Sequence, residues 1–132
     1  PQKGTLFVSV KDSDKAKILP VIRSFSKQGF KILATSGTAQ FLIDGGVKTK
    51  IINKVSQGSP HCVDALLEDK IDIVINTTET RKSINDSFGI RRTALIKNIP
   101  YSLTVSGARA SINSIKRLKA EDITVNPITD FH

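Results

Sequence analysis

Ile71-Asp72-Ile73-Val74-Ile75-Asn76-Thr77-Thr78 is the stretch that indicates the fold class most clearly. It begins as a β-branched apolar run with almost no alternation, which is typical of a central strand buried on both faces of a parallel sheet. The run then ends in an amide and two hydroxyls. Ligands of open α/β sheets collect outside the carboxyl ends of the strands, so Asn76, Thr77 and Thr78 are candidate site residues. The alternative is that they form only a turn and cap the next helix.

Strands and helices alternate along the chain on both sides of this central strand. We predict the other strands at 5–10, 30–34, 47–53 and 101–105. We predict helices at 14–27, from the turn 35–38 to Gly45-Gly46, and at 61–69, 90–97 and 108–118. This alternation indicates right-handed crossovers and a parallel sheet covered on both faces. The fold class is therefore α/β, a three-layer α/β/α arrangement with a five-stranded parallel sheet.

Three local features qualify this prediction. Pro20 lies inside the first helix, where a proline costs about 3 kcal/mol, so we expect distortion there. The polar stretch 79–88 is expected to lead into the helix that starts at Ile90. The tail 123–132 is expected to add a short strand, at an edge of the sheet because of Pro127.

Size and charge are the next constraints on function. The chain has 132 residues, 39% of them hydrophobic, so we expect residues 1–132 to form a single domain with one core. It carries 20 basic and 12 acidic residues, a net charge of +8, which favours an anionic partner. A nucleotide, a phosphate, an acidic protein surface and a nucleic acid all fit this charge. The basic residues are scattered, however, and few aromatic residues are present to stack on bases.

A single cysteine, Cys62, excludes an internal disulfide and suits a reducing compartment. His61 lies beside it, but the further ligands of a zinc site are missing, so we expect no metal and no cofactor. No signal peptide is recognisable, and no apolar run approaches the ~20 residues that cross a bilayer. We therefore expect a cytoplasmic protein without a membrane partner. Because the sequence contains no methionine, we also expect it to be a piece of a longer chain.

Groups that can bind an anion follow four successive predicted strands. They are Ser9 with the nearby Lys15, the turn Thr35 to Thr38 with Gly37, Lys54, and Asn76 to Thr78. In a parallel sheet these groups share one edge, where amines, hydroxyls, an amide and backbone N–H groups make a phosphate receptor. No carboxylate is among them, although a general base or a metal site would need one.

Lys15 gives an independent indication of a bound anion. It lies in the first turn of a helix, where a cation opposes the macrodipole and an anion would relieve the repulsion. A solvated lysine and an ordinary capped turn are the alternatives for Lys15 and for residues 35–38. A second basic group, Arg81, Lys82, Arg91 and Arg92, could be a solvated helix face or could contact an acidic neighbour in a larger protein.

Several short motifs, in this order and spacing, carry a resemblance to a known family. They are Lys3-Gly4, Ser9-Val10, Asp14-Lys15, Lys27-Gln28-Gly29-Phe30, Ala34-Thr35 with Gly37-Thr38-Ala39, Asn53-Lys54-Val55, Pro60-His61, Ile75-Asn76-Thr77-Thr78, and Ile90-Arg91-Arg92 with Ala94-Leu95. With these motifs the sequence resembles the methylglyoxal-synthase-like domain. The most similar version is the allosteric domain at the carboxyl terminus of the carbamoyl phosphate synthetase large subunit.

This resemblance implies a regulatory domain. In the family, the domain binds a nucleoside monophosphate, UMP as inhibitor or IMP as activator, and alters how the synthetase handles ATP. The parent enzyme is a glutamine-hydrolysing ligase of pyrimidine and arginine biosynthesis. The implied partners are the rest of the large subunit and, through it, the small glutaminase subunit, with no nucleic acid.

The resemblance also implies which residues bind the nucleotide. The family's phosphate ligands match Lys15, Thr35, Thr38, Lys54, Asn76, Thr77 and Thr78, with Ser9 and Gly37 close by. The sugar and base are expected toward the start of the helix at Ile90, and no catalytic residue is implied.

Two enzyme relatives are the competing prediction. Methylglyoxal synthase acts on dihydroxyacetone phosphate and uses an aspartate base, but the matching loop here reads Gln57-Gly58-Ser59-Pro60-His61 and has no carboxylate. The cyclohydrolase of purine synthesis needs a Lys-Thr-Leu-His-Pro motif, of which Lys48-Thr49-Lys50 is only a partial match. The alternative function is therefore a free-standing enzyme of this type that acts on a small phosphorylated substrate.

Overall fold

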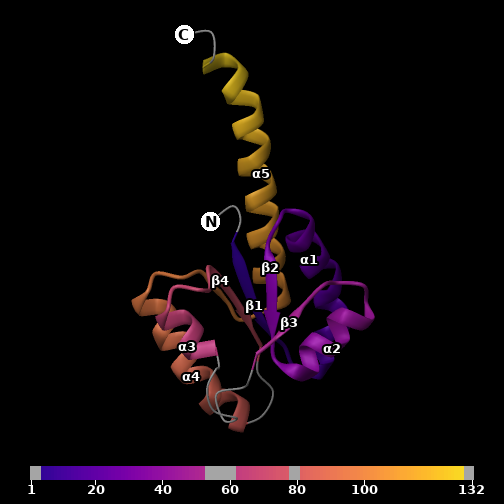
Figure 1. Cartoon of the computed structure of the whole chain (residues 1–132), viewed down its shortest axis with the longest axis vertical. Coiled ribbons are helices and arrows are strands. Elements are labelled where there is room, and N and C mark those ends of the chain that lie inside the picture. The colour runs from indigo at the N-terminus through magenta and orange to yellow at the C-terminus, as the bar shows by residue number, and fades with distance from the viewer. Residues whose placement is uncertain (1–3, 53–61, 78–80, 130–132) are drawn as a thin grey trace.

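A five-stranded parallel sheet forms the centre of the computed structural model, which describes residues 4–52, 62–77 and 81–129 (Figure 1). The strands are β1 (Thr5–Ser9), β2 (Lys31–Ala34), β3 (Lys50–Ile51), β4 (Ile73–Asn76) and β5 (Tyr101–Ser102). Their spatial order is β3-β2-β1-β4-β5, and every neighbouring pair is parallel. The predicted fold class is confirmed. The middle strand, however, is β1, and the stretch that we expected at the centre forms β4 beside it.

Helices follow the strands as the alternation predicts. After β1 come the 3-10 helix η1 (Asp12–Asp14) and α1 (Lys15–Lys27), and β2 leads into α2 (Ser36–Asp44). The remaining helices are α3 (Cys62–Leu67), α4 (Arg81–Ile96) and α5 (Val105–Thr129). Gly29 closes α1 with a φ of +96°, a conformation that suits glycine at the end of a helix. Within the described residues, no helix is long and apolar enough to cross a membrane.

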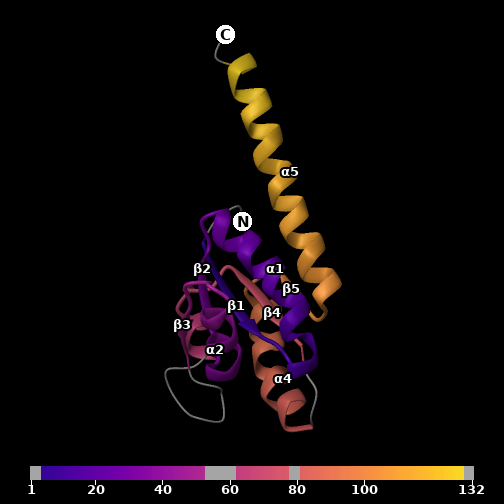
Figure 2. The same cartoon turned by 90° about the vertical axis from the view of Figure 1, so that its right-hand side faces the viewer.

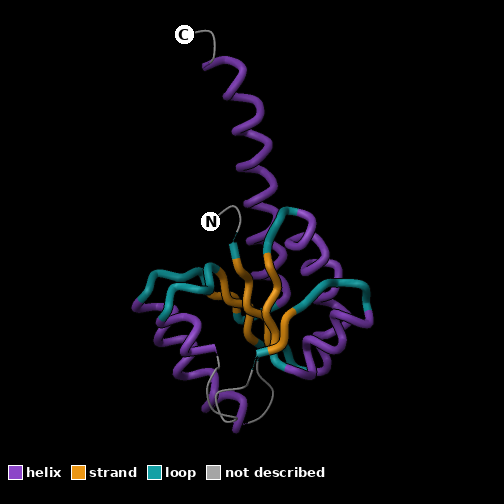
Figure 3. Tube along the Cα trace, viewed as in Figure 1, coloured by secondary structure: helices purple, strands orange, loops and turns teal. Residues whose placement is uncertain are grey.

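The two faces of the sheet are covered by different helices (Figure 3). Alternate residues of β1 point to opposite faces, as the strand period requires. Leu6 and Val8 join a core with the buried residues of α1, α2 and α5, whereas Phe7 joins a second core with α3 and α4. The carboxyl edge of the sheet therefore lies between helices α1 and α2 on one side and α3 and α4 on the other.

The structure confirms the predicted helix around Pro20 and corrects the start of another helix. Helix α1 is continuous through Pro20, which lies on the exposed side, where water can replace the missing backbone donor. Helix α4 begins at Arg81, so most of the stretch 79–88 is helical although it is polar. Polar residues occur in helices as well as in loops. The segment RKSINDSF contains neither of the strong helix breakers, glycine and proline.

The carboxyl-terminal part of the chain differs most from the prediction. Strand β5 ends at Ser102, and Val105 already begins α5, which continues to Thr129 through the stretch expected to be an edge strand. Helix α5 extends beyond the rest of the domain (Figure 2). A helix can extend in this way because its backbone bonds are internal, whereas a strand would need a sheet edge beside it.

Candidate functional site

The carboxyl ends of β2, β1 and β4 lie side by side because the three strands are adjacent and parallel. In the pairing register, Ser9 is opposite Asn76 and Val8 is opposite Ala34. The residues that follow each strand are therefore brought to one edge, as predicted. Of the candidate residues, Lys54 and Thr78 lie outside the described part of the chain.

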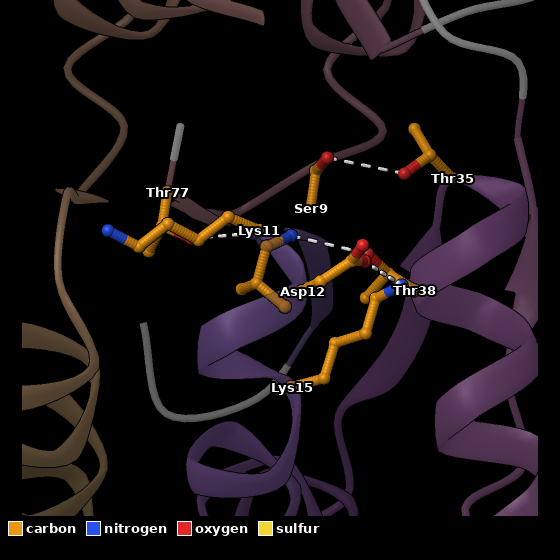
Figure 4. Close-up of polar contacts among 8 residues, drawn as sticks. Ser9, Lys11, Asp12, Lys15, Thr35, Thr38 and Thr77 are labelled. Atoms are coloured by element: carbon orange, nitrogen blue, oxygen red, sulfur yellow. Dashed lines mark hydrogen bonds and ion pairs between the residues drawn. The ribbon is translucent and has the colours of Figure 1, made fainter. Parts of the chain in front are cut away.

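Two buried threonines hold the loop that follows β1 (Figure 4). The backbone N–H of Val10 donates to Thr38 Oγ1 at 3.2 Å, and the N–H of Lys11 donates to Thr77 Oγ1 at 2.9 Å. Thr77 in turn donates its own N–H to the Ser9 carbonyl at 2.9 Å. Each hydroxyl accepts in these bonds, and a hydroxyl that accepts retains a proton to donate. Thr38 and Thr77 can therefore hold the loop and still donate to an anion.

Ser9 and Thr35 form the next contact along the edge. Their side-chain oxygens share a hydrogen bond of 3.2 Å, which links the ends of β1 and β2. Thr35 is also the N-cap residue of α2, but its side chain makes no capping bond. The first N–H groups of α2 thus have neither an intrahelical partner nor this side-chain cap. They form a concentration of partial positive charge at the edge of the sheet.

Lys15 extends from the first turn of α1 to this end of α2. A Cβ atom added at Gly37, the second residue of α2, would lie 3.5 Å from Lys15 Nζ. The Lys15 side chain is 21% exposed, and its ammonium pairs with Asp12 Oδ1 at 2.6 Å. Figure 4 shows that the side chains of Asp12, Lys15 and Thr38 lie close to one another. None of the predicted site residues is a carboxylate, but Asp12 places one beside Lys15.

Asn76 and Ile90 make contacts that the sequence did not predict. The buried Asn76 donates from Nδ2 to the hydroxyl of Tyr101 at 2.8 Å, so its side chain connects β4 to β5. Ile90 is buried in the second core cluster with Phe7, Leu66 and Val74. It lies well inside α4 and not at the start of a helix, because α4 begins at Arg81. Ile90 therefore contributes to packing between α4 and the sheet.

Of the second basic group, the structure describes the side chains of Arg91 and Arg92. Arg91 and Arg92 are exposed on α4, which packs on the face of the sheet opposite α1 and α2. Among the described residues, no group of three or more His, Cys, Asp or Glu side chains could hold a metal ion.

The described part of the site is thus an ammonium, a helix N-terminus and four hydroxyls around the loop after β1. Such donors accommodate a tetrahedral anion with several oxygens, such as a phosphate group. The only described carboxylate in direct contact with them, Asp12, is held by Lys15.

Comparison with known proteins agrees with this fold. The family model described as "MGS-like domain" matches residues 17–103. The chain belongs to the MGS-like domain family. The matched range includes Thr35, Gly37, Thr38, Asn76 and Thr77.

The relatives of this MGS-like domain are much longer proteins. This chain is 46% identical over 131 residues to a protein named carbamoyl phosphate synthase large chain from Rhizobium meliloti (strain 1021). The match covers 99% of this chain and 11% of the relative. The chain is also 41% identical over 133 residues to a carbamoyl phosphate synthase large chain, C-terminal section, from Methanopyrus kandleri, covering 100% of this chain and 24% of the relative. The chain thus spans about a tenth of the length of the first of these relatives.

Among solved structures, the MGS-like domain is similar to a crystal structure of methylglyoxal synthase from Elizabethkingia anophelis NUHP1. The TM-score is 0.64 with 17% sequence identity, and the match covers 85% of this chain and 78% of the other. This likeness shows the shared fold alone.

Sequence reasoning missed two residues of the MGS-like domain's carboxyl edge. Asp12 lies three residues before Lys15, and this i,i+3 spacing is the available signal for an ion pair. Tyr101 had no such signal, because its contact with Asn76 depends on the register of β4 and β5, where Val74 pairs with Tyr101.

Proposed function

We propose that this MGS-like domain is an allosteric nucleotide-binding domain of a carbamoyl phosphate synthase large chain, formed by residues 1–132 as a single unit. It binds UMP, IMP or both through their phosphate group at the carboxyl edge of the sheet. Binding regulates carbamoyl phosphate synthesis for the pyrimidine and arginine pathways. Identities of 41% to 46% with carbamoyl phosphate synthase large chains support this parent.

The catalytic work belongs to the rest of the parent, which in this proposal is an ATP-dependent, glutamine-hydrolysing ligase in the cytoplasm. The chain covers only 11% of the Rhizobium meliloti relative, so most of that protein lies outside the region compared. The domain itself has no turnover and no cofactor. Its partners are the nucleotide, the remainder of the large subunit and, through it, the small glutaminase subunit.

The position of Lys15 is the observation that carries the nucleotide proposal. Its ammonium lies against Gly37 at the N-terminus of α2, so two positive groups from separate helices face one place. Thr38, only 3% exposed, holds the adjoining loop there through Val10. Both positive groups attract an anion, and the Asp12 carboxylate already contacts the Lys15 ammonium in the unliganded domain. A nucleotide phosphate carries the required charge and oxygen acceptors.

Calorimetric titration of Lys15→Ala with UMP and IMP tests the proposal. A charge-assisted hydrogen bond contributes about 1.5 to 3 kcal/mol, so the affinity should fall on the order of 10- to 150-fold. Lys54→Ala, at the second lysine that the family resemblance implies, should show a similar loss. Lys17→Ala is the matched control, because Lys17 is exposed on the same helix and should leave the affinity nearly unchanged.

The Lys15→Ala domain should still fold. Its loss of the ion pair with Asp12, whose carboxylate is exposed, removes about 0.2 to 1 kcal/mol at most. A thermal-shift screen of UMP, IMP, AMP, GMP and inorganic phosphate then identifies the effector, since a ligand stabilises the state that binds it. If Lys15→Ala and Lys54→Ala bind UMP and IMP as well as the parent chain does, the proposed site is wrong.

The alternative is an enzyme that acts on a small phosphorylated substrate, as in methylglyoxal synthase. Such an enzyme needs a base that is available to take a proton from its substrate. Asp12 is a poor candidate because its carboxylate contacts the Lys15 ammonium. An assay of methylglyoxal formation from dihydroxyacetone phosphate separates the two functions, since turnover abolished by Asp12→Asn would favour the enzyme.

A further inference from the structure

The two side chains of the ion pair between Asp12 and Lys15 differ in their exposure to solvent. The carboxylate side chain of Asp12 is 85% exposed, whereas the side chain of Lys15 is only 21% exposed. Asp12 lies in the short helix η1, and Lys15 is the first residue of α1. The ammonium is thus held toward the end of α2, and the carboxylate approaches it from the solvent side.

Asp12 therefore makes the contact with the Lys15 ammonium that the proposed ligand would need. Both a carboxylate and a phosphate place oxygen atoms on Lys15 Nζ, and at 2.6 Å the carboxylate is in direct contact. A phosphate beside Lys15 would also be repelled by a carboxylate that stayed in place. Asp12 can move away from Lys15 when its side chain changes rotamer, which exposed side chains do within nanoseconds.

We propose that Asp12 is an intramolecular competitor that sets the affinity of the phosphate site. This inference rests on the proposed nucleotide-binding function. In the unliganded domain, Asp12 neutralises Lys15, and the anion binds only the fraction of molecules in which the pair is open. The apparent affinity is lowered by that fraction, as for any ligand whose binding-competent state is partly populated.

The strength of the pair determines the expected effect. Exposed ion pairs contribute about 0.2 to 1 kcal/mol, which corresponds to an affinity lowered about 1.4- to 5-fold. A pair of this strength lowers the affinity of every anion that uses Lys15 by the same factor. Asp12 thus sets the ligand concentration at which the regulatory site fills.

The test is titration of the Asp12→Asn domain with inorganic phosphate and with UMP. Asparagine keeps the size of the side chain and removes the charge, so both affinities should rise about 1.4- to 5-fold. Asp14→Asn is the matched control. It removes the same charge from the N-cap position of α1, where the Asp14 side chain makes no capping bond. Its effect should be clearly smaller than that of Asp12→Asn.

A double-mutant cycle with Lys15→Ala shows whether Asp12 acts through Lys15. In the Lys15→Ala background, Asp12→Asn should change phosphate affinity no more than Asp14→Asn does. Equal gains from Asp12→Asn and Asp14→Asn in the parent chain would overturn the inference and indicate a long-range charge effect. If Lys15→Ala itself leaves phosphate binding unchanged, the proposed site fails instead, so the two failures are distinguishable.

Discussion

At the N-terminus of α2, the missing side chain of Gly37 leaves the space that Lys15 approaches. Replacing Gly37 by alanine puts a methyl group 3.5 Å from Lys15 Nζ, an ordinary contact that requires no rearrangement. Alanine also favours a helix by up to about 1 kcal/mol over glycine, so thermal stability should hold or rise. In the proposed site, however, the methyl group would take up space beside the ammonium and the helix N-terminus that the anion needs. Phosphate affinity measured by calorimetry should fall on the order of tenfold.

A second helical glycine provides the control for this prediction. Gly89 lies in α4, and a Cβ added there would meet only Val63 Cγ2 at 3.8 Å. Gly89→Ala should therefore affect stability alone and leave phosphate affinity as it is. Undiminished binding by Gly37→Ala would show that the anion does not use the space beside Gly37.

The same residues show how far sequence reasoning reaches at this scale. Ser9, Thr35 and Thr77 could be predicted to meet at one edge, because strand ends follow from local hydrophobic runs and parallel strands align their carboxyl ends. Side-chain partners could not be predicted in this way. The bond from Asn76 to Tyr101 depends on the register between two strands, and the burial of Ile90 depends on where α4 begins.

Among the elements, α5 shows how packing defines a helix that local signals predict only in part. Its buried residues Ala108, Ile112 and Ile115 lie within the predicted range 108–118. Beyond that range, Lys119 Nζ donates to the Gln28 carbonyl at 2.6 Å, near the carboxyl end of α1. A positive charge is favourable there because the helix dipole is negative at that end. Such a contact between distant segments leaves no periodic signal in the sequence.

The packing of α5 leads to a stability prediction. Ile112 is 2% exposed in the core shared with α1 and the sheet, so Ile112→Ala should lower the free energy of unfolding by about 2 to 5 kcal/mol. Leu118 lies on the same helix but is 48% exposed, and Leu118→Ala should cost less than about 1 kcal/mol. Urea unfolding of both variants measures the difference. Similar losses for the two would mean that α5 does not pack on the sheet through Ile112.

For the whole molecule, the basic residues that give the net charge of +8 are scattered along the sequence. Exposed basic residues occur on α1, near β3, on α4 and on α5, for example Lys17, Lys48, Arg92 and Arg117. A groove for nucleic acid would instead gather such residues along one track, with aromatic side chains for stacking. Scattered charge of this kind is more typical of a protein that attracts anions in general and binds one of them at a small specific site than of a nucleic-acid groove.

Salt dependence distinguishes that arrangement from a nucleic-acid-binding surface. Each phosphate contact on a single strand contributes a slope of about −0.7 to log K against log salt, so an extended strand gives a steep loss. A mononucleotide offers one phosphate group, and the slope for UMP should stay at about −1 to −2, measured by titration between about 50 and 200 mM salt. An oligonucleotide titrated beside it should bind weakly and compete poorly with UMP, because only its terminal phosphate can enter a site defined by Lys15, Lys54 and the N-terminus of α2. Tight oligonucleotide binding that Lys15→Ala leaves intact would mean that the charge serves a polyanion through other residues.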